Sequence, residues 1–293
     1  MLDVDGVPRG QPVLDALVEL LDLEPLDDNL FRGRSPAQSP IRVFGGQVAA
    51  QALIACGRTV DPVRRVHSLH AYFVRAGDPR VPIIYQVERV RDGRSFSTRR
   101  LVALQHGQII FLMSSSFQLD EPGIDHGVSM PDVPAPEELP SLAQRLAGAP
   151  DAPAFWAKMP RPVDLRYVND PPYAARGSGP RPGARSQVWF RADGLLPDDD
   201  LLHVCVLAYL SDLTLLDSVL ATHGLAAGVD DVQVASLDHA MWFHRPVRMD
   251  DWVLYDTESP SASGSRGLAT GHFFAAGGAL LVTVVQEGLV RLR

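Results

Sequence analysis

Two stretches of 14 residues decide the fold: FGGQVAAQALIACG at residues 44–57 and SDLTLLDSVLATHG at residues 211–224. The first is small or apolar on nearly every helical face, and the second has the same length and the same terminal glycine. Glycine often terminates helices, and a helix that is apolar all round must be enclosed by other elements. The sequence therefore predicts two buried helices, which end at Gly57 and Gly224.

The segments that follow these two helices also resemble each other. HAYFVRAGD, which contains Arg75, and AMWFHRPVR, which contains Arg245, both read as strands with an aromatic pair and an arginine. Further on, LQHGQIIF around Gly107 and FAAGGALL around Gly277 carry the signal of a two-strand hairpin. We interpret the chain as an internal repeat, in which each half contains a helix followed by about four antiparallel strands.

The fold class predicted by this repeat is α+β, with a curved antiparallel sheet wrapped around a long buried helix in each half. Proline is frequent between the two halves. We divide the chain into an N-terminal domain at residues 12–120, a Pro-rich linker at 121–162 and a C-terminal domain at 163–293. Within the linker we expect one short helix near Ser141–Leu146. After the linker we expect a strand near Val163–Val168.

Composition excludes several classes of protein. The chain has 293 residues, 46% of them hydrophobic and 21% charged, which is typical of a globular protein. Its net charge of -8 gives no support for nonspecific binding to nucleic acid or to an anionic membrane. The longest nearly apolar run, Leu201–Leu210, is too short to span a bilayer, and the N-terminal residues do not resemble a signal peptide. We expect a cytoplasmic protein without stable membrane insertion, in which Cys56 and Cys205 are small core residues.

Common catalytic motifs are missing from the sequence. The nearest match to G-x-S-x-G has Ser263 at its first position, and there is no G-x-G-x-x-G, phosphate loop or H-E-x-x-H. His67 and His70 are three residues apart on a predicted strand and therefore face opposite sides of the sheet. The odd spacing of His239 and His244 has the same consequence. The sequence predicts neither a metal site nor a cofactor.

Differences between the two halves indicate where chemistry is retained. Three polar residues of the second half stand opposite other residues of the first: Asp212 opposite Gly45, Ser236 opposite Val66 and Gln286 opposite Ser116. An alternative role for Asp212 is a helix N-cap or first-turn acid, and for Ser236 a hydrogen bond at a turn or strand start. Gln286 shares a strand face with valines, where a buried amide needs polar partners such as an aspartate and a serine.

Six runs of sequence resemble the acyl-CoA thioesterase II family, whose members are tandem double-hotdog proteins: VFGGQVAAQAL, VHSLHAYFVRAGD, RDGRSFSTRR, ASLDHAMWFHRP, ESPSASGSRG and VVQEGLVR. The resemblance covers nearly the whole chain and weakens only in the linker. It implies a double-hotdog fold and hydrolysis of fatty acyl-CoA to free fatty acid and CoA. In that family an Asp, a Ser or Thr and a Gln surround the hydrolytic water, and they match Asp212 in YLSD, Ser236 in ASLDH and Gln286 in VVQEG.

The mechanism implied by the resemblance is direct attack of water on the thioester, with no acyl-enzyme. Asp212 would be the base, while Ser236 and Gln286 would orient the water. Backbone N–H groups at a helix start are a natural source of oxyanion stabilisation, which makes Gly45 and Gly46 candidates.

Further candidates for substrate binding are His67, which could border the site, and arginines that could bind the CoA phosphates: Arg64, Arg65, Arg75 and Arg245. An alternative for each arginine is a solvated surface position or a pair between strands, and for the histidine a structural role on its strand.

Two other functions fit the same fold. A noncatalytic acyl-CoA-binding double hotdog, acting as a sensor or carrier, is disfavoured because Asp212, Ser236 and Gln286 are all present. A hydratase, which would need an Asp-x4-His pair, is the least favoured. The open sheet edges of a double hotdog predict a homo-oligomer. The C-terminal sequence RLR lacks an S-K-L type peroxisomal address, in agreement with the expected cytoplasmic location.

Overall fold

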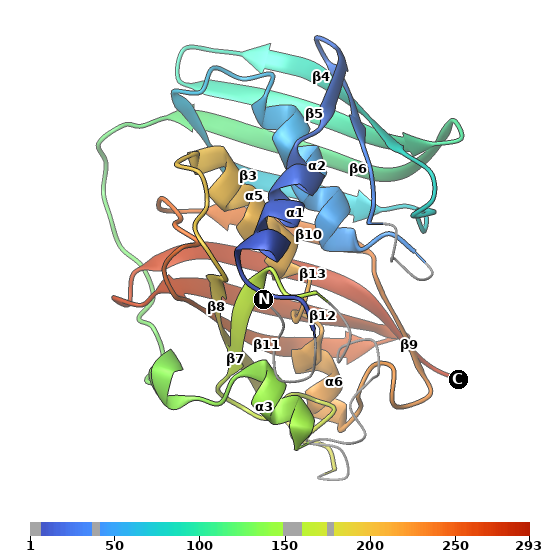
Figure 1. Cartoon of the computed structure of the whole chain (residues 1–293), viewed down its shortest axis with the longest axis vertical. Coiled ribbons are helices and arrows are strands. Elements are labelled where there is room, and N and C mark those ends of the chain that lie inside the picture. Colours follow the sequence, from blue (N-terminus) through green and yellow to red (C-terminus); the bar gives the residue numbers. More distant parts are fainter. Residues whose placement is uncertain (1–6, 37–41, 149–159, 175–178) are drawn as a thin grey trace.

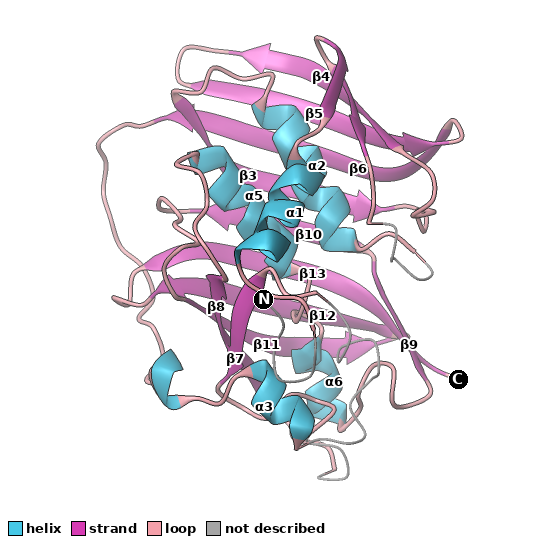
Figure 2. Cartoon of the chain, viewed as in Figure 1, coloured by secondary structure: helices cyan, strands magenta, loops and turns pink. Residues whose placement is uncertain are grey.

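The structure is a computed structural model of the chain, and it describes residues 7–36, 42–148, 160–174 and 179–293. Helices and antiparallel strands form the expected α+β class (Figures 1 and 2). The first part of the chain contains α1 (Gln11–Leu21), β1 (Glu24–Asp27), β2 (Leu30–Gly33), α2 (Gly45–Gly57), β3 (Arg64–Phe73), β4 (Ile83–Asp92), β5 (Phe96–Gln105) and β6 (Gln108–Leu119).

The second part of the chain begins with two short helical elements and continues with strands on either side of two helices. Its elements are η1 (Pro136–Glu138), α3 (Leu142–Ala147), β7 (Val163–Tyr167), β8 (Arg185–Ala192), α5 (Asp200–Ser211), α6 (Asp217–His223), β9 (Val232–Ser236), β10 (Asp238–Phe243), β11 (Val253–Ser263), β12 (Arg266–Ala275) and β13 (Leu280–Leu292). The predicted hairpins at Gly107 and Gly277 join β5 to β6 and β12 to β13, as expected.

One continuous sheet contains all the strands, and its order is mirrored about the centre. The strands follow the order β1-β2-β4-β5-β6-β3-β10-β13-β12-β11-β8-β7, and β9 pairs with β13 beside this path. The two halves join where β3 pairs antiparallel with β10, with Leu69 opposite Met241 and Ala71 opposite His239. The helices α2, α5 and α6 lie against one side of this sheet (Figure 1).

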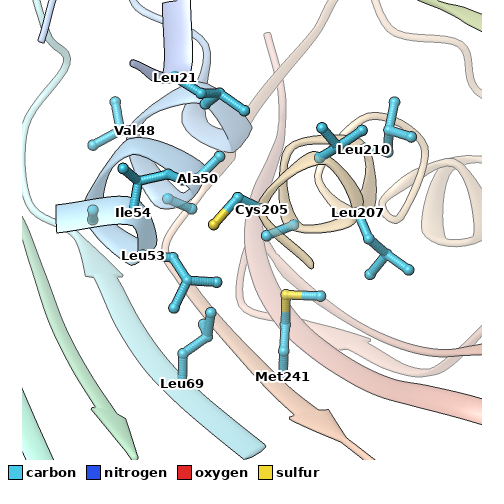
Figure 3. Packing of buried hydrophobic residues seen from close by; sticks show 14 of the residues in the cluster. Leu21, Val48, Ala50, Leu53, Ile54, Leu69, Cys205, Leu207, Leu210 and Met241 are labelled. Atoms are coloured by element: carbon cyan, nitrogen blue, oxygen red, sulfur yellow. The ribbon is translucent and has the colours of Figure 1, made fainter. Parts of the chain in front are cut away.

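The helix α2 is enclosed as its sequence predicts. Every residue from Gly46 to Cys56 is buried, because the helix contacts α5 on one side and β4, β5 and β6 of its own half on the other. In Figure 3, Cys205 of α5 points toward α2, and Leu53 of α2 points toward Leu69 of β3 in the sheet. Full burial of each large apolar side chain here contributes roughly 1.5 to 3 kcal/mol. Cys56 and Cys205 are free and buried in this core, as expected.

The second predicted helix, at residues 211–224, is wrong as a single element. The helix α5 ends at Ser211, residues 212–216 form turns, and α6 then runs to His223. The physical reason is that α5 packs against α2, whereas α6 packs against β8, β11 and β12 of its own half. One straight helix cannot do both. The predicted end at Gly224 is confirmed, since this residue caps α6 with a positive φ of 67°.

The described part of the linker packs against the C-terminal half. The predicted short helix is α3, which begins with a capping box between Ser141 and Gln144. Ahead of it, Trp189 donates a hydrogen bond to the carbonyl of Pro134 at 3.1 Å, and Trp252 donates to Glu137 at 2.9 Å. The part of the linker at residues 149–159 lies outside the described residues.

Gly46 allows α2 to approach α5 closely. A Cβ atom added at this position would overlap the backbone carbonyl oxygen of Tyr209 in α5. A backbone atom cannot turn away as a side chain can, so the space is available only to glycine. The contact fixes the start of α2 next to the end of α5.

We predict that Gly46→Ala lowers the free energy of unfolding by about 1 to 3 kcal/mol, the usual cost of overpacking, despite the better helix propensity of alanine. Urea denaturation of the full chain measures this change. Gly123→Ala is the matched control, because no heavy atom lies within 4 Å of the Cβ that it adds. Equal stability of the two variants would contradict the proposed close contact.

Candidate active site

The three residues singled out by comparing the two halves lie together in the structure. Ser236 Oγ donates a hydrogen bond to Asp212 Oδ1 at 3.0 Å, and Gln286 Nε2 donates to the same oxygen at 3.1 Å. Gln286 Nε2 also donates to Ser236 Oγ at 2.8 Å. The result is a closed triangle of hydrogen bonds between a carboxylate, a hydroxyl and an amide.

Each of these side chains is placed by the end or the interior of a regular element. Asp212 follows the last residue of α5 and caps its C-terminus, so the alternative role as a helix N-cap is wrong. Ser236 is the last residue of β9 and pairs with Gly288 of β13, two residues beyond Gln286. The ladder breaks at Leu237, where β9 gives way to β10, and this break leaves Ser236 beside Gln286.

The N-terminus of α2 faces the carboxylate of Asp212. A Cβ atom added at Gly45 would lie 2.6 Å from Asp212 Oδ2 and 2.9 Å from the ring of Phe73. The backbone N–H of Gly46 also donates a hydrogen bond to Asp212. Gly45 and Gly46 are therefore brought to the same site as the three polar side chains, and Oδ2 is directed toward them while Oδ1 is held by Ser236 and Gln286.

Burial raises the pKa of Asp212 above its ordinary value. The rise is opposed by the nearby charge of His239 and by hydrogen bonds from Gln286, Ser236 and the Gly46 backbone, in that order. Desolvation disfavours the charged carboxylate, whereas donors aimed at its oxygens favour it. A carboxylate with a raised pKa is a stronger base than an exposed one, which suits proton abstraction near neutral pH.

A fourth residue, His239, belongs to the site and was missed in the sequence. It is 1% exposed, its Nδ1 lies 2.5 Å from Gln286 Oε1, and its Nε2 lies 2.8 Å from Ser211 Oγ. Burial lowers the pKa of this imidazole. His239 was considered only as a metal ligand, so its place in the site was not predicted. The comparison of the two halves contained the signal, because an offset of 170 residues places His239 opposite Leu69.

The structure corrects the counterpart of Gln286, which is Ser115 and not Ser116. Ala269 pairs with Gln286 across β12 and β13, whereas its counterpart Arg99 pairs with Ser115 across β5 and β6. The hairpin of the second half contains one residue more than the hairpin of the first, so the offset grows from 170 to 171 after the turn. Like Gln286, Ser115 is buried.

The other candidate residues take part in separate interactions. His67 Nε2 lies 2.8 Å from Ser116 Oγ, and the ring of His67 packs edge-on against Phe96. Arg64 donates to Ser97 Oγ at 2.9 Å, and Arg65 forms an ion pair with Asp200 at 2.9 Å. Within the described residues, neither His67 nor these arginines hydrogen-bond to the triangle.

The remaining two arginines have similar positions in the two halves. Arg75 donates to the carbonyl of Ile109 at 2.7 Å, and Arg245 donates to the carbonyl of Leu280 at 2.5 Å. Arg245 also pairs with Asp125. These contacts agree with the alternative of pairs between neighbouring segments, and the binding of CoA phosphates by these residues stays a prediction.

Arg42, which the sequence patterns did not single out, contacts β9, the strand that ends at Ser236. Arg42 is exposed and donates to the carbonyl of Val234 at 3.0 Å, two residues before Ser236. It connects the segment that leads into α2, whose first residue is Gly45, to β9, whose last residue is Ser236. Its guanidinium has further N–H groups beyond the one used in this contact.

The structure gives no support to a hydratase site. The spacing Asp-x4-His occurs once, at Asp198 and His203. Asp198 pairs with Arg248 at 2.5 Å, whereas the buried His203 accepts a hydrogen bond from the N–H of Met249 at 3.0 Å. Among the described residues, no group of three or more His, Cys, Asp or Glu is arranged to hold a metal ion. No helix within the residues that the structure describes is long and apolar enough to cross a membrane.

Solved structures identify the class to which this fold belongs. A conserved protein with a hot dog fold from Alicyclobacillus acidocaldarius superposes with a TM-score of 0.77 at 20% identity, over 95% of this chain and 98% of the other. The helix enclosed by an antiparallel sheet is therefore a hotdog fold.

The family follows from more similar proteins. A model of the acyl-CoA thioesterase family matches residues 159–289, and one for the N-terminal domain of acyl-CoA thioesterases matches residues 32–118. Human acyl-coenzyme A thioesterase 8 is 42% identical, over 98% of this chain and 92% of its own length. The acyl-CoA thioesterase II TesB2 from Mycobacterium marinum is 46% identical with a TM-score of 0.78, over 95% of this chain and 98% of its own. The chain belongs to the acyl-CoA thioesterase family, as its sequence predicted.

Proposed function

We propose that the site at Asp212 hydrolyses fatty acyl-CoA to a free fatty acid and CoA by direct attack of water. The observation that carries this proposal is the hydrogen-bonded triangle, which holds one oxygen of a buried carboxylate and leaves the other directed toward the start of α2. Membership of the acyl-CoA thioesterase family gives the reaction, and the triangle gives it a base. The same membership disfavours the alternative of a noncatalytic acyl-CoA-binding sensor or carrier.

The hydrogen atoms of the triangle indicate how a water molecule is held. Both N–H groups of Gln286 are used, one on Asp212 Oδ1 and one on Ser236 Oγ, and the Ser236 hydroxyl proton is used on Asp212. The free positions are therefore acceptors, on Asp212 Oδ2 and Ser236 Oγ. A water that donates one proton to each has its oxygen lone pair directed outward for attack. In this scheme Gln286 orients the other two side chains and does not contact the water.

The chemical step balances without a covalent intermediate on the enzyme. Asp212 takes a proton from the water as the water oxygen bonds to the thioester carbonyl carbon, and an oxyanion forms. The carbon–sulfur bond then breaks, and the CoA thiolate receives the proton from Asp212. We place the oxyanion at the N-terminus of α2, where the N–H groups of the first turn have no partner within the helix. The absence of a side chain at Gly45 leaves room for Asp212 Oδ2 beside this helix start.

We further propose that the molecule is a double hotdog, with domains at residues 12–120 and 163–293 joined by the linker at 121–162. The mirrored strand order supports this division, as do separate family matches for the two halves. The sheet ends in the open edges of β1 and β7, which are consistent with assembly into a homo-oligomer. We also propose a cytoplasmic location.

Asp212→Asn is expected to lower the rate of free-thiol release from acyl-CoA by about 10²- to 10⁴-fold, the usual contribution of a general base. The measurement uses a panel of short- to long-chain acyl-CoAs, which also gives the preferred chain length. The exposed Asp231 provides the matched control as Asp231→Asn, which should keep full activity. Unchanged release by a folded Asp212→Asn variant would remove this residue from the mechanism.

The pH dependence of kcat/KM should report the raised pKa of Asp212. The base must be ionised, so activity should fall as the pH is lowered through that pKa. Since burial raises the pKa above 3.8, the loss should begin at a higher pH than an exposed aspartate would show. His239 and Tyr255 are the titratable groups whose charges interact with it. An acid limb at or below pH 3.8 would contradict the raised pKa.

Arg42→Ala is expected to raise KM for acyl-CoA several-fold and to leave kcat nearly unchanged, because we propose that its exposed guanidinium contacts the anionic CoA portion at the mouth of the site. Steady-state kinetics measure both constants. Arg80→Ala is the control, since Arg80 is exposed and paired only with its neighbour Asp78 in the described structure. A fall in kcat with constant KM would speak against this role.

A further inference from the structure

The amide of Gln286 must point one way for the triangle to exist. Its Nε2 donates to Asp212 and Ser236, and a half turn of the amide would place Oε1 against the Asp212 carboxylate instead. Two acceptor oxygens without a hydrogen between them repel each other, and both would lose their partners in a buried site. In the productive orientation the buried Oε1 also needs a donor of its own, which the triangle does not supply.

We propose that His239 is a positioning residue that locks the amide of Gln286 in its productive orientation. Its Nδ1 lies 2.5 Å from Gln286 Oε1, on the side of the amide away from Asp212. His239 does not touch Asp212 or Ser236 through any hydrogen bond among the described residues. This inference rests on the proposed hydrolysis, because it assigns a role in holding the base of that reaction.

The protons of His239 support the assignment. Gln286 Oε1 has no hydrogen to donate, so Nδ1 must carry one. In the neutral imidazole, Nε2 then accepts a hydrogen bond from the Ser211 hydroxyl, 2.8 Å away. In the imidazolium, Nε2 donates to Ser211 Oγ, and the Ser211 hydroxyl donates to the carbonyl of Ala208 at 2.9 Å. Nδ1–H therefore reaches Gln286 in both charge states.

The support for His239 continues into the core. Ser211 immediately precedes Asp212, and its carbonyl accepts a hydrogen bond from Tyr255 at 3.1 Å. The chain of contacts thus runs from β11 through the end of α5 to β10 and β13. Burial favours the neutral imidazole, while the charges of Asp212 and Asp238 and the hydrogen bond with Gln286 favour the cation. Every residue in this series of contacts belongs to a helix or a strand.

The first half of the molecule shows how the fold packs without this device. Leu69 and Ser115 take the places of His239 and Gln286 there, opposite each other across β3 and β6. Both are buried, with 0% and 2% exposure. A leucine at this strand position is therefore compatible with the fold. The histidine serves the site of the second half rather than the packing of the sheet.

The test compares His239→Leu with His239→Asn. Leucine copies the first half but cannot donate to Gln286, whereas the amide nitrogen of asparagine replaces Nδ1–H. We expect kcat of His239→Leu to fall at least about 10-fold with KM changed less than about 3-fold, and His239→Asn to recover most of this loss. His244→Asn is the control, since His244 follows β10 but contacts only Thr283 Oγ1 among the hydrogen-bonding side chains described. Wild-type kcat in His239→Leu, or an equal loss in both His239 variants, would overturn the proposal.

A double-mutant cycle separates positioning from general damage. If His239 acts through Gln286, adding His239→Leu to Gln286→Leu should cost little further activity, because the amide is already absent. Multiplicative losses would contradict the proposal. Full activity of Asp212→Asn would instead defeat the proposed hydrolysis itself, so the two failures are distinguishable. Should the leucine variant not fold, NMR of ¹⁵N-labelled histidine in the wild-type protein decides, because the proposal requires a proton on His239 Nδ1.

Discussion

The close packing of α2 on α5 is the constraint on which the site depends. Gly46 brings the start of α2 against the backbone of Tyr209, and Asp212 follows three residues later at the end of α5. The positive end of one helix therefore faces a carboxylate that caps the other. This contact crosses between the two halves of the chain, so neither half forms the site alone. The break between α5 and α6 belongs to the same arrangement, because it allows α5 to pack against α2 while α6 packs against the strands of its own half.

Burial of the charged Asp212 carboxylate is unfavourable, and its neighbours offset part of that cost. Donors from Ser236, Gln286 and the Gly46 backbone favour the charged form, yet burial prevails and the pKa is raised. A base that remained fully solvated would keep the weaker basicity of an ordinary aspartate. The network thus keeps the carboxylate ionisable while leaving it more basic than in water. Gln286 is central, since it supports both Asp212 and Ser236 and needs a fixed orientation to do so.

Much of this molecule was accessible from the sequence, and the errors have physical causes. The terminal glycines gave the ends of α2 and α6, and asymmetry between the repeats found Asp212, Ser236 and Gln286. The pattern did not reveal the break at residues 212–216, because apolar residues are required equally against α2 and against the sheet. The β12–β13 hairpin contains one residue more than the β5–β6 hairpin, so the counterpart of Gln286 is shifted by one residue. The pairing of the strands reveals this shift. His239 was overlooked because it was considered only as a metal ligand, although the repeat places it opposite Leu69.

The confinement of the polar site to one half follows from its geometry. Gly45 is the first residue of α2 and Asp212 follows the last residue of α5, so the structure does not place them at matching positions of their helices. They face each other instead, and a Cβ added at Gly45 would lie only 2.6 Å from Asp212 Oδ2. A side chain at position 45 would displace the carboxylate. A second aspartate there would place two carboxylates in contact, and two such groups cannot both ionise. Position 45 therefore cannot carry a second base beside Asp212. The first half has glycine at this contact, and its Leu69 and Ser115 are buried in the core.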